Sequence, residues 1–333
     1  MVPVSVKVAL VACMALAGIA GAAGDEDRKD DWNDGRNDDR ADTAALRGIQ
    51  GHSLFGDPLI SPLPDRETVD KLTAARMEYE LDSADPDNII WYGRRLAYAG
   101  DFRAAIRIFS EGIDRHPQDA RMYRHRGHRY ISVREFDRAI EDLEYAADLI
   151  EGSQDRIEPD GLPNALNIPV STLHGNIWYH LGLAWYLKQN WLNAYRAFQA
   201  GFETGANDDN VVSTTHWRYM ILRRMGKMDE ANDVLADIAK DMNVLENTVY
   251  HRLCLFYDGK LSLEEIAAEV ADSPTGTAAA YGVANWFFYN GDRAEADRRL
   301  REILRSDQWA SFGYMAAEAD LASRGEDSSL PSR

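Results

Sequence analysis

The sequence predicts an all-α protein made of stacked helix hairpins, and two observations support this fold class. One set of small and large residues recurs along the chain, with the same internal spacing in each copy. Within each copy, the apolar residues follow two helical stripes, separated in the first copy by Gly100-Asp101. A lone hairpin of this kind cannot bury both of its faces, so consecutive copies have to stack on one another.

The recurrence involves five positions in three copies. The first copy has Gly93, Leu96, Ala105, Phe109 and Gly112. The second copy, 34 residues later, has Gly127, Tyr130, Ala139, Leu143 and Ala146. The third copy, 55 residues further on, has Gly182, Trp185, Ala194, Phe198 and Gly201. Since 55 is 34 plus 21, one insertion of 21 residues within 151–174 accounts for the offset at every position.

The first copy shows how each hairpin is built. Its first stripe follows the spacing i, i+3, i+4, i+7, i+8 and consists of Ile89, Tyr92, Gly93, Leu96 and Ala97. Gly100-Asp101 ends that helix, and the second stripe consists of Ala105, Ile106, Phe109 and Ile113. We expect the small residues Gly93 and Ala105 to let the two helices approach closely, and Gly112 to leave room for the next hairpin.

This order of residues resembles the tetratricopeptide repeat (TPR). The family's consensus is a bulky residue, then Leu-Gly, Tyr, Ala, Phe, Ala and Pro, and it corresponds here to Ile89, Tyr92-Gly93, Leu96, Ala105, Phe109, Gly112 and Pro117. The resemblance is specific over residues 86–206, fair to 240 and loose thereafter. It implies a right-handed superhelix of TPR-like helix hairpins (an α–α solenoid) that binds ligands in a concave groove lined by the first helix of each hairpin.

The predicted organisation places most of the chain in this solenoid. Residues 1–22 read as a signal peptide, 23–64 as a disordered acidic spacer and an extended strap, 65–325 as the solenoid, and 326–333 as a flexible tail. The solenoid is divided into repeats near 86–119, 120–150, 175–208, 212–244, a degenerate 245–275, 277–305, and a capping helix 306–325 with Ser306 as its N-cap. Residues 151–174 form the insertion, which is expected to be either a tolerated surface loop or a binding element.

The first residues indicate export. One cation, Lys7, precedes an apolar run that ends in Ala20-Gly21-Ala22, which is typical of a secretory signal peptide cleaved after Ala22 or Ala23. The run is too short for a comfortable bilayer span, so we expect a periplasmic or secreted protein with no integral membrane span in the mature chain. The alternative is a membrane-anchored lipoprotein, because Leu10-Val11-Ala12-Cys13 resembles a lipobox.

Composition excludes several classes of protein. The net charge of −18 repels phosphate backbones, so nucleic acid is not an expected partner. Two cysteines, Cys13 and Cys254, cannot build a disulfide framework or a cysteine-based zinc site. No phosphate-binding loop, nucleophile elbow, dinucleotide fingerprint or H-E-x-x-H motif is present, so we expect neither an enzyme, nor a cofactor, nor a metal.

The candidate groove consists of first-helix residues that lie off the packing stripes. These are Arg94, Arg121, Arg124, His128, Tyr179, Tyr186, His216 and Arg223. Arginine forks suit carboxylates and phosphates, and tyrosines add flat contact area with one polar tip. Alternatively, the arginines pair with acids of neighbouring repeats, such as Glu135, or face water. His125 and His180, which occupy the same place in consecutive hairpins, are interpreted as packing histidines.

These features predict an exported, non-enzymatic scaffold that binds a protein or peptide in its concave groove through an acidic segment or a carboxylate. The alternative is a receptor for a small anionic ligand or a glycan, with an enzyme a distant third. An open groove of uniform width would favour a peptide, whereas a closed pocket under residues 151–174 would favour a small ligand. The sequence leaves the identity of the partner and the oligomeric state open.

Overall fold

The computed structural model describes residues 48–205, 207–266 and 276–325. The predicted signal peptide 1–22 with Cys13, the alternative lipidation site, lies outside the described residues, as do the spacer up to residue 47 and the tail 326–333. The same holds for residues 267–275 of the degenerate repeat.

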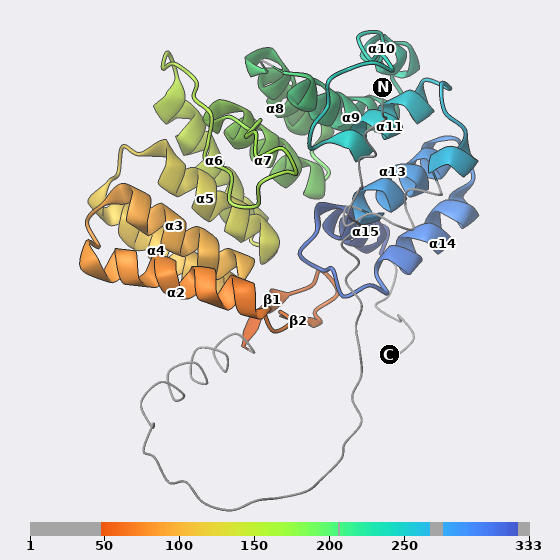
Figure 1. The fold of residues 1–333 in the computed structure, drawn as a ribbon. Helices are drawn as coiled ribbons and strands as arrows, with labels where there is room; N and C mark the ends of the chain where they lie inside the picture. The colour runs from red at the N-terminus through yellow and green to blue at the C-terminus, as the bar shows by residue number, and fades with distance from the viewer. Residues whose placement is uncertain (1–47, 206, 267–275, 326–333) are drawn as a thin grey trace, which may run out of the picture. The chain divides into compact units, whose positions relative to one another are not determined.

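Helices make up nearly all of the described structure, as predicted, and Figure 1 shows them following one another from α2 to α15. The first hairpins comprise α2 (Arg66–Leu81), α3 (Pro86–Tyr98), α4 (Phe102–Arg115), α5 (Ala120–Ser132), α6 (Phe136–Ile150), α7 (Leu173–Leu187) and α8 (Trp191–Thr204). The remainder comprises α9 (Asp208–Arg224), α10 (Met228–Asp233), α11 (Thr248–Tyr257), α13 (Gly276–Tyr289), α14 (Arg293–Ile303) and α15 (Phe312–Ala322). The all-α superhelix of helix hairpins is therefore confirmed.

The repeated glycines hold each hairpin together by close contact. A Cβ added at Gly127 in α5 would lie 2.7 Å from Cγ of Leu143 in α6, and one added at Gly182 in α7 would lie 2.7 Å from the Phe198 ring in α8. Real Cβ atoms do not approach other atoms so closely, so the large residue of the second helix occupies the space that the missing side chain leaves. The predicted pairing of small and large positions is confirmed.

Consecutive hairpins pack by the same rule. A Cβ at Gly112 in α4 would lie 2.7 Å from Sδ of Met122, which belongs to the following hairpin, and 2.9 Å from Cγ2 of Ile89. Gly112 thus leaves room for its neighbour, as expected from the sequence.

The turns between paired helices each contain one residue with positive φ. Four of these residues are glycines, at Gly100, Gly226, Gly259 and Gly291. The other two are Arg134 (φ 66°) and Gln189 (φ 56°), where an L side chain is strained. Both of these side chains reach α15: Arg134 bonds Glu318, and Gln189 Nε2 donates to Ser323 Oγ at 2.7 Å. Contacts with the C-terminal helix therefore offset the strain in these two turns.

The structure differs from the sequence prediction in three elements. Helix α2, which the sequence did not single out, packs against α3. The second helix of the fourth repeat is short, covering only Met228–Asp233. The final helix begins at Phe312 rather than after Ser306, because Ser311 is its N-cap and accepts a hydrogen bond from the Tyr314 amide.

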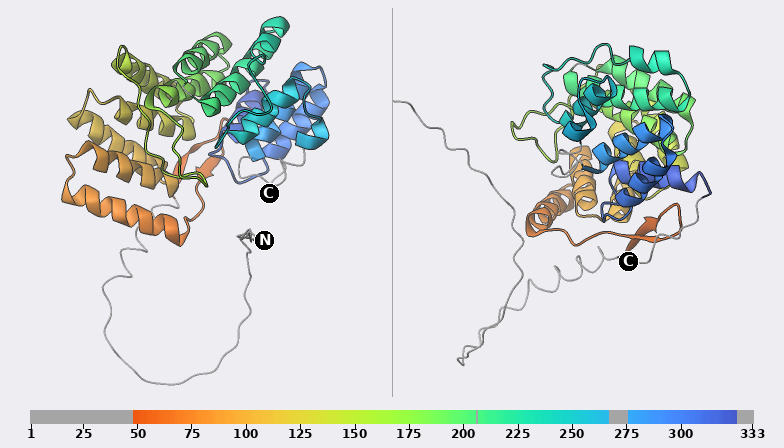
Figure 2. Two further views of the ribbon diagram at one scale, coloured as in Figure 1. Left: turned by 45° about the horizontal axis from the view of Figure 1, so that its top comes forward. Right: turned by 90° about the vertical axis from the view of Figure 1, so that its right-hand side faces the viewer.

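A strap of residues 48–65 precedes the helices and contains the antiparallel strands β1 (Ile49–His52) and β2 (Pro58–Ile60). Ser61 Oγ donates to the Gly100 carbonyl at 2.7 Å, which fixes the strap to the turn of the first hairpin. Trp309 Nε1 donates to the Ile60 carbonyl at 2.9 Å, which fixes it to the C-terminal segment. Figure 2 accordingly shows the strand pair beside the blue C-terminal helices.

The C-terminal helices fill the space that an open superhelix would leave. Helix α15 contacts α7, and α13 contacts α9. Arg134 and Glu318 form a buried ion pair of 2.6 Å between Nη2 and Oε2, across a sequence separation of 184 residues. Much of the concave face is therefore covered by the chain itself. Among the described helices, none is both long and apolar enough to cross a bilayer.

Candidate functional site

A pocket of about 230 Å³ lies between the first helices of the hairpins and the insertion. Helix α3 contributes Arg94 and Tyr98, and α5 contributes Arg124, His125, His128 and Arg129. The remaining polar lining comes from α7 and the insertion and consists of Glu158, Asp160, Ser171, Asn176 and His180, together with Glu246 from the segment before α11. We refer to this cavity as the arginine pocket.

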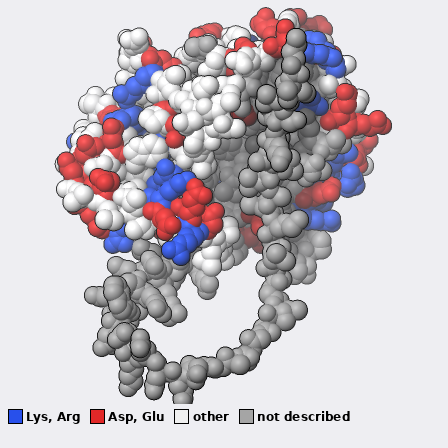
Figure 3. All heavy atoms as spheres, in the orientation of Figure 1, with Lys and Arg blue, Asp and Glu red and all other residues white. Residues whose placement is uncertain are grey.

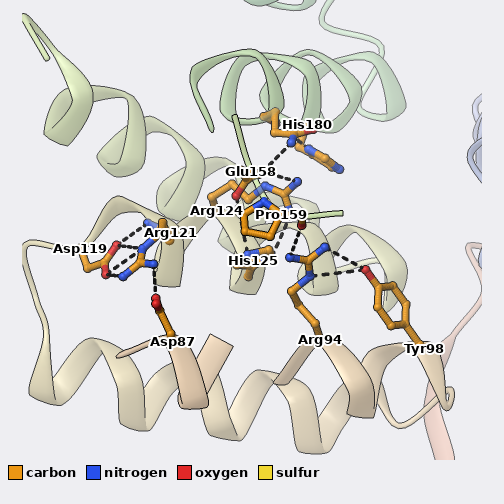
Figure 4. Close-up of polar contacts among 11 residues, drawn as sticks. Asp87, Arg94, Tyr98, Asp119, Arg121, Arg124, His125, Glu158, Pro159 and His180 are labelled. Atoms are coloured by element: carbon orange, nitrogen blue, oxygen red, sulfur yellow. Dashed lines mark hydrogen bonds and ion pairs between the residues drawn. The ribbon is translucent and has the colours of Figure 1, made fainter. Parts of the chain in front are cut away.

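The insertion closes the arginine pocket on one side (Figure 4). Arg94 Nη1 donates to the Pro159 carbonyl at 2.8 Å, and its Nη2 donates to the Tyr98 hydroxyl at 3.2 Å. Arg95 Nη1 donates to the Gly161 carbonyl at 3.1 Å, and Gly161 lies so close to the Tyr98 ring that a Cβ would not fit. The loop is therefore attached to α3 through its main chain, which leaves Arg94 without a carboxylate partner among the described residues.

Glu158 is the carboxylate of this site that pairs with an arginine. Its Oε2 lies 2.9 Å from Arg124 Nη2 and also accepts a hydrogen bond from the Asn176 side-chain amide. Both charged side chains are about nine-tenths buried. Burial lowers the pKa of Arg124, Glu158 opposes that change, and nearby Arg94 adds to it. The pocket thus already holds one paired carboxylate, and its lining includes two further ones, Asp160 and Glu246, which form no ion pair with an arginine among the described residues.

His125 connects Arg124 to Glu158 and has a defined tautomer. Arg124 Nη1 lies 2.8 Å from His125 Nδ1, and because a guanidinium only donates, Nδ1 accepts and the proton is on Nε2. Nε2 lies 3.7 Å from Glu158 Oε1. Burial and the neighbouring Arg124 hold the pKa of His125 well below its usual value, so the ring is neutral at pH 7. It is a packing and orienting histidine, as the sequence suggested.

Arg129 is the least compensated cation of the pocket. Its guanidinium contacts the Phe102 ring at 5.6 Å, and no carboxylate pairs with it in the described parts of the chain. Burial, together with Arg124 and Arg94, lowers the pKa of Arg129 to about 9, with Tyr98 opposing the change. The lowered pKa has the direction expected of a partly buried guanidinium that has cationic neighbours and no paired carboxylate.

Two more histidines form the floor beside Phe312 of α15. The rings of His128 and His180 lie 4.1 Å apart, and Phe312 lies 5.5 Å from His128 and 5.9 Å from His180. Burial lowers the pKa of both imidazoles well below the usual value, and Arg129 lowers that of His128 further while Arg124 lowers that of His180. Since His180 Nδ1 donates to the Asn176 carbonyl at 2.6 Å, its Nε2 carries no proton.

A second pocket of about 280 Å³ adjoins the first and shares Ser171, Asn176, His180 and Glu246 with it. Its other lining includes Tyr179, Asn210, Ser213, Tyr250 and Phe312. Tyr179 is hydrogen-bonded on both sides, accepting from Trp217 Nε1 at 2.9 Å and donating to Tyr250 at 3.1 Å. We refer to this cavity as the amide pocket.

The eight residues predicted for the groove therefore separate into three groups. Arg94, Arg124 and His128 line the arginine pocket, and Tyr179 lines the amide pocket. The other four are Arg121, Tyr186, His216 and Arg223, which line neither. As Figure 4 shows for one of them, Arg121 lies apart and pairs with Asp119 and Asp87, which is the alternative that the sequence left open.

The C-terminal half of the chain covers three of those four residues. Tyr186 is buried and shares a 2.6 Å hydrogen bond with Tyr281 of α13. His216 stacks on Tyr250 with a centroid distance of 4.7 Å. Arg223 donates to Asn290 Oδ1 at 2.8 Å. They do not converge with Arg94 and Arg124, because α11 and α13 lie against the faces that an open superhelix would expose.

Sequence reasoning missed Glu158 and Arg129. Arg129 occupies the position of Arg95 one repeat later, so the 34-residue period contained a signal for it. Glu158 lies in a loop without periodicity, and its contact with Arg124 depends on how the insertion folds back. The only indication of Glu158 in the sequence was the presence of the insertion.

The arrangement suits anion binding better than acid–base chemistry. The histidines of the pocket are neutral with strongly lowered pKa values, and Glu158 is paired with Arg124. General acid–base catalysis favours groups whose pKa lies near the working pH. No cluster of three His, Cys, Asp or Glu side chains that could hold a metal ion occurs within residues 48–205, 207–266 and 276–325. Cys254 is a free cysteine and is buried.

Comparison with known proteins gives structural neighbours only. No protein-family model matches the sequence, and no curated protein matches it. Among solved structures, the chain is similar to a TPR protein from Parabacteroides merdae ATCC 43184, with 13% identity, a TM-score of 0.46, and coverage of 75% of this chain and 92% of that one. It is also similar to YrrB, a TPR protein with an unusual peptide-binding site, with 16% identity, a TM-score of 0.40, and coverage of 76% and 99%.

A third similar structure is MamA, with 16% identity, a TM-score of 0.35, and coverage of 70% of this chain and 96% of that one. At such identities, what these proteins bind says nothing about the ligand of this chain. Its own packing of Gly93 on Phe109, Gly127 on Leu143 and Gly182 on Phe198 gives the chain a TPR-like fold.

Proposed function

We propose that the protein is an exported, non-catalytic binding protein that holds a small anionic molecule in the arginine pocket. The observation that carries the proposal is the pair Arg94 and Arg129, two cations that line a partly covered pocket without an ion-pair partner among the described residues. A partly buried cation without a paired counter-charge is unfavourable, and an anionic ligand would supply that charge. Export rests on the signal-peptide pattern of residues 1–22.

The pocket favours a compact ligand over an extended peptide. The insertion covers one side through Glu158 and Pro159, and Phe312 of α15 closes the interior beside His128 and His180. An extended peptide would need a groove that continues along the concave face to His216 and Tyr186, which contact α11 and α13 instead. The part of the predicted groove that is left for a ligand is therefore limited to these two pockets.

The test is titration of the purified protein with acetate, succinate and inorganic phosphate by calorimetry. We expect at least one of these anions to bind the wild type and to lose at least about tenfold in affinity in Arg129→Gln, because charged hydrogen bonds are each worth about 1.5–3 kcal/mol. Arg107→Gln, which removes an exposed arginine of α4, should bind like the wild type. Failure of all three anions to bind, or equal losses in both variants, would refute the proposal.

The substitution should leave the fold intact. Because Arg129 has no ion pair to lose in the described structure, its replacement should change the unfolding midpoint little. Arg124→Glu is a poorer test, since it would bring two carboxylates together against buried Glu158 and destabilise the site itself.

A scaffold for a protein partner is the second candidate, and the insertion favours it. Four large apolar side chains are exposed within twelve residues there: Ile157 (56%), Leu162 (67%), Leu166 (63%) and Ile168 (48%). The surface over this loop is correspondingly mostly white in Figure 3. Clustered exposed apolar side chains mark interaction surfaces more often than single ones do.

Photo-crosslinking in cells from position 166 tests this candidate. Position 192, on α8, serves as the control, because Leu192 is exposed to a similar degree outside the insertion. A single protein species captured from position 166 and not from position 192 would support a scaffold role, and identical patterns from both positions would remove it.

A further inference from the structure

The arginine pocket contains two carboxylates that its arginines do not use. Asp160 of the insertion and Glu246 of the segment before α11 line the same cavity as the unpaired arginines. Each accepts one hydrogen bond from a neutral group: the Leu162 backbone amide donates to Asp160 Oδ1 at 2.9 Å, and Asn164 Nδ2 donates to Glu246 Oε1 at 2.7 Å. Both residues are partly exposed, and neither forms an ion pair with a residue that the structure describes, so both have charge to offer a ligand.

The insertion positions both carboxylates. Asp160 directly follows Pro159, whose carbonyl accepts a hydrogen bond from Arg94 Nη1 at 2.8 Å (Figure 4). Glu246 is tied to the insertion by its hydrogen bond with Asn164. The cations come from helices α3 and α5 instead, and the two that lack an ion pair among the described residues are likewise partly exposed. Charges of both signs therefore reach one cavity from different elements.

Asp160 and Glu246 also lie close enough to repel each other. Burial raises the pKa of Glu246, the Asn164 hydrogen bond opposes that change, and the charges of Asp160 and Asp209 add to it. The charge of Asp209 is already satisfied by three backbone amides of the segment before α11. An ammonium group beside Asp160 and Glu246 would relieve the repulsion between them, because an opposite charge favours the ionised form of a carboxyl group.

The charges that line the arginine pocket are balanced. Its described lining includes three arginines and three carboxylates, and its imidazoles are neutral. Arg124 and Glu158 pair with each other, which leaves two charges of each sign without an ion pair among the described residues. A simple anion would compensate the arginines but would be repelled by the acids, whereas a ligand with both charges would compensate both.

We propose, building on the proposed function of the arginines, that the ligand of the arginine pocket is a small amino acid. Its carboxylate pairs with Arg94 and Arg129, because guanidinium groups bind carboxylates through charge-assisted hydrogen bonds. Its ammonium group pairs with Asp160 and Glu246, because three N–H donors can serve two carboxylates at once. All four side chains line one cavity of about 230 Å³, so neither end of the ligand has to leave it.

Three sets of probes test this assignment by calorimetry at pH 7. Glycine, β-alanine and γ-aminobutyrate carry both charges at increasing separation. Acetate, propionate and butyrate lack the ammonium group, and methylamine, ethylamine and propylamine lack the carboxylate. We expect at least one amino acid to bind the wild type about tenfold or more tightly than both of its matched probes, because each charged end adds charge-assisted hydrogen bonds.

Neutral isosteres of the two acids separate this inference from the function on which it rests. Asp160→Asn and Glu246→Gln keep the oxygen that accepts the observed hydrogen bond and remove only the charge. Each should weaken binding of the best amino acid several-fold to about tenfold, and leave binding of its matched carboxylate unchanged or tighter, since a repelling charge is lost. Arg129→Gln should weaken both ligands. Glu151→Gln, which removes an exposed carboxylate of the same insertion outside the pocket lining, should change neither.

Three results would overturn the amino acid while leaving anion binding intact: the matched carboxylates binding as tightly as the amino acids, both isosteres binding the best amino acid like the wild type, or an isostere weakening the matched carboxylate as much as the amino acid. Circular dichroism and the unfolding midpoint check that each variant is folded. An amine that binds as tightly as its amino acid would show that the arginines take no carboxylate, which contradicts the proposed function as well. If no amino acid, carboxylate or phosphate binds the wild type, the proposed function itself fails and the inference fails with it.

Discussion

Arg134 and Glu318 form a buried ion pair between the turn of the second hairpin and the last helix, with the two side chains only 3% and 1% exposed. Arg134 also donates to the Trp309 carbonyl at 2.8 Å and to the Ser132 carbonyl at 2.7 Å, and the Leu54 amide of the strap donates to Glu318. Three segments that are far apart in the sequence therefore meet at one charged pair.

Removing one partner of this pair should be strongly destabilising. Glu318→Gln leaves the Arg134 charge buried without compensation, so we expect the free energy of unfolding to fall by about 3–5 kcal/mol. Urea unfolding at neutral pH measures the change. Arg138→Gln is the matched control, because Arg138 also pairs with a glutamate but is 61% exposed, and its loss should matter little. Similar losses of unfolding free energy in both variants would show that the contact between the Arg134 turn and the last helix contributes no particular stability.

The hairpin glycines give a second prediction. Gly127→Leu should reduce the free energy of unfolding by about 1–3 kcal/mol or more, because even the Cβ would lie 2.7 Å from Leu143. Ala74→Leu on the exposed face of α2 is the control and should be tolerated. A Gly127→Leu protein as stable as the wild type would mean that α5 and α6 do not pack as described.

Acid should destabilise the protein through its buried histidines. Burial lowers the pKa of His216 to about 3, and the pKa values of His125, His128 and His180 are also well below the usual 6.5. Below about pH 6.5 the unfolded chain takes up protons that the folded chain does not, so the free energy of unfolding falls as the pH decreases. Each such histidine contributes up to about 1.4 kcal/mol per pH unit.

The measurement is the free energy of unfolding between pH 7.5 and 5, with one histidine removed at a time. His216→Gln keeps a hydrogen-bonding side chain but cannot titrate, so the slope against pH should become smaller. His52→Gln, which removes an exposed histidine at the end of β1, is the control and should behave like the wild type. An unaltered slope in His216→Gln would contradict the burial of a neutral imidazole there.

The internal carboxylate allows a rescue experiment. Glu158→Ala leaves Arg124 without its anion and opens space at the pocket, so we expect the melting temperature to fall and added acetate to restore part of it. Sodium chloride at the same ionic strength should restore less, since it lacks the carboxylate. Glu80→Ala on exposed α2 is the control, and acetate should act on it as it acts on the wild type.

The local architecture was predictable from the sequence because repeat packing is a short-range property. Gly93 and Phe109 belong to one hairpin, and their spacing alone indicated that they would touch. The same holds for Gly112, whose close neighbour Met122 lies in the next hairpin. Such contacts recur with the period of the chain, so periodicity is enough to find them.

The candidate site was only partly predictable, for the opposite reason. Arg94, Arg124 and His128 were identified from the register of the first helices, and they do line one pocket. Tyr186 and His216 have the same register, yet α13 and α11 cover them. Whether the concave face is open depends on contacts such as that between Arg134 and Glu318, which lie 184 residues apart. Such contacts do not recur with the repeat period, so the periodicity of the sequence does not predict them.

The contacts of the strap and of the Arg134 turn with the C-terminal segment also fix the number of repeats in the chain. In an open solenoid, a unit can be duplicated or deleted because each unit contacts only its neighbours. Here an extra hairpin would displace the final helix from the Arg134 turn and separate the strap from Trp309. Gain or loss of a whole repeat should therefore be selected against in this chain, and variation should concentrate in loops such as 151–174 instead.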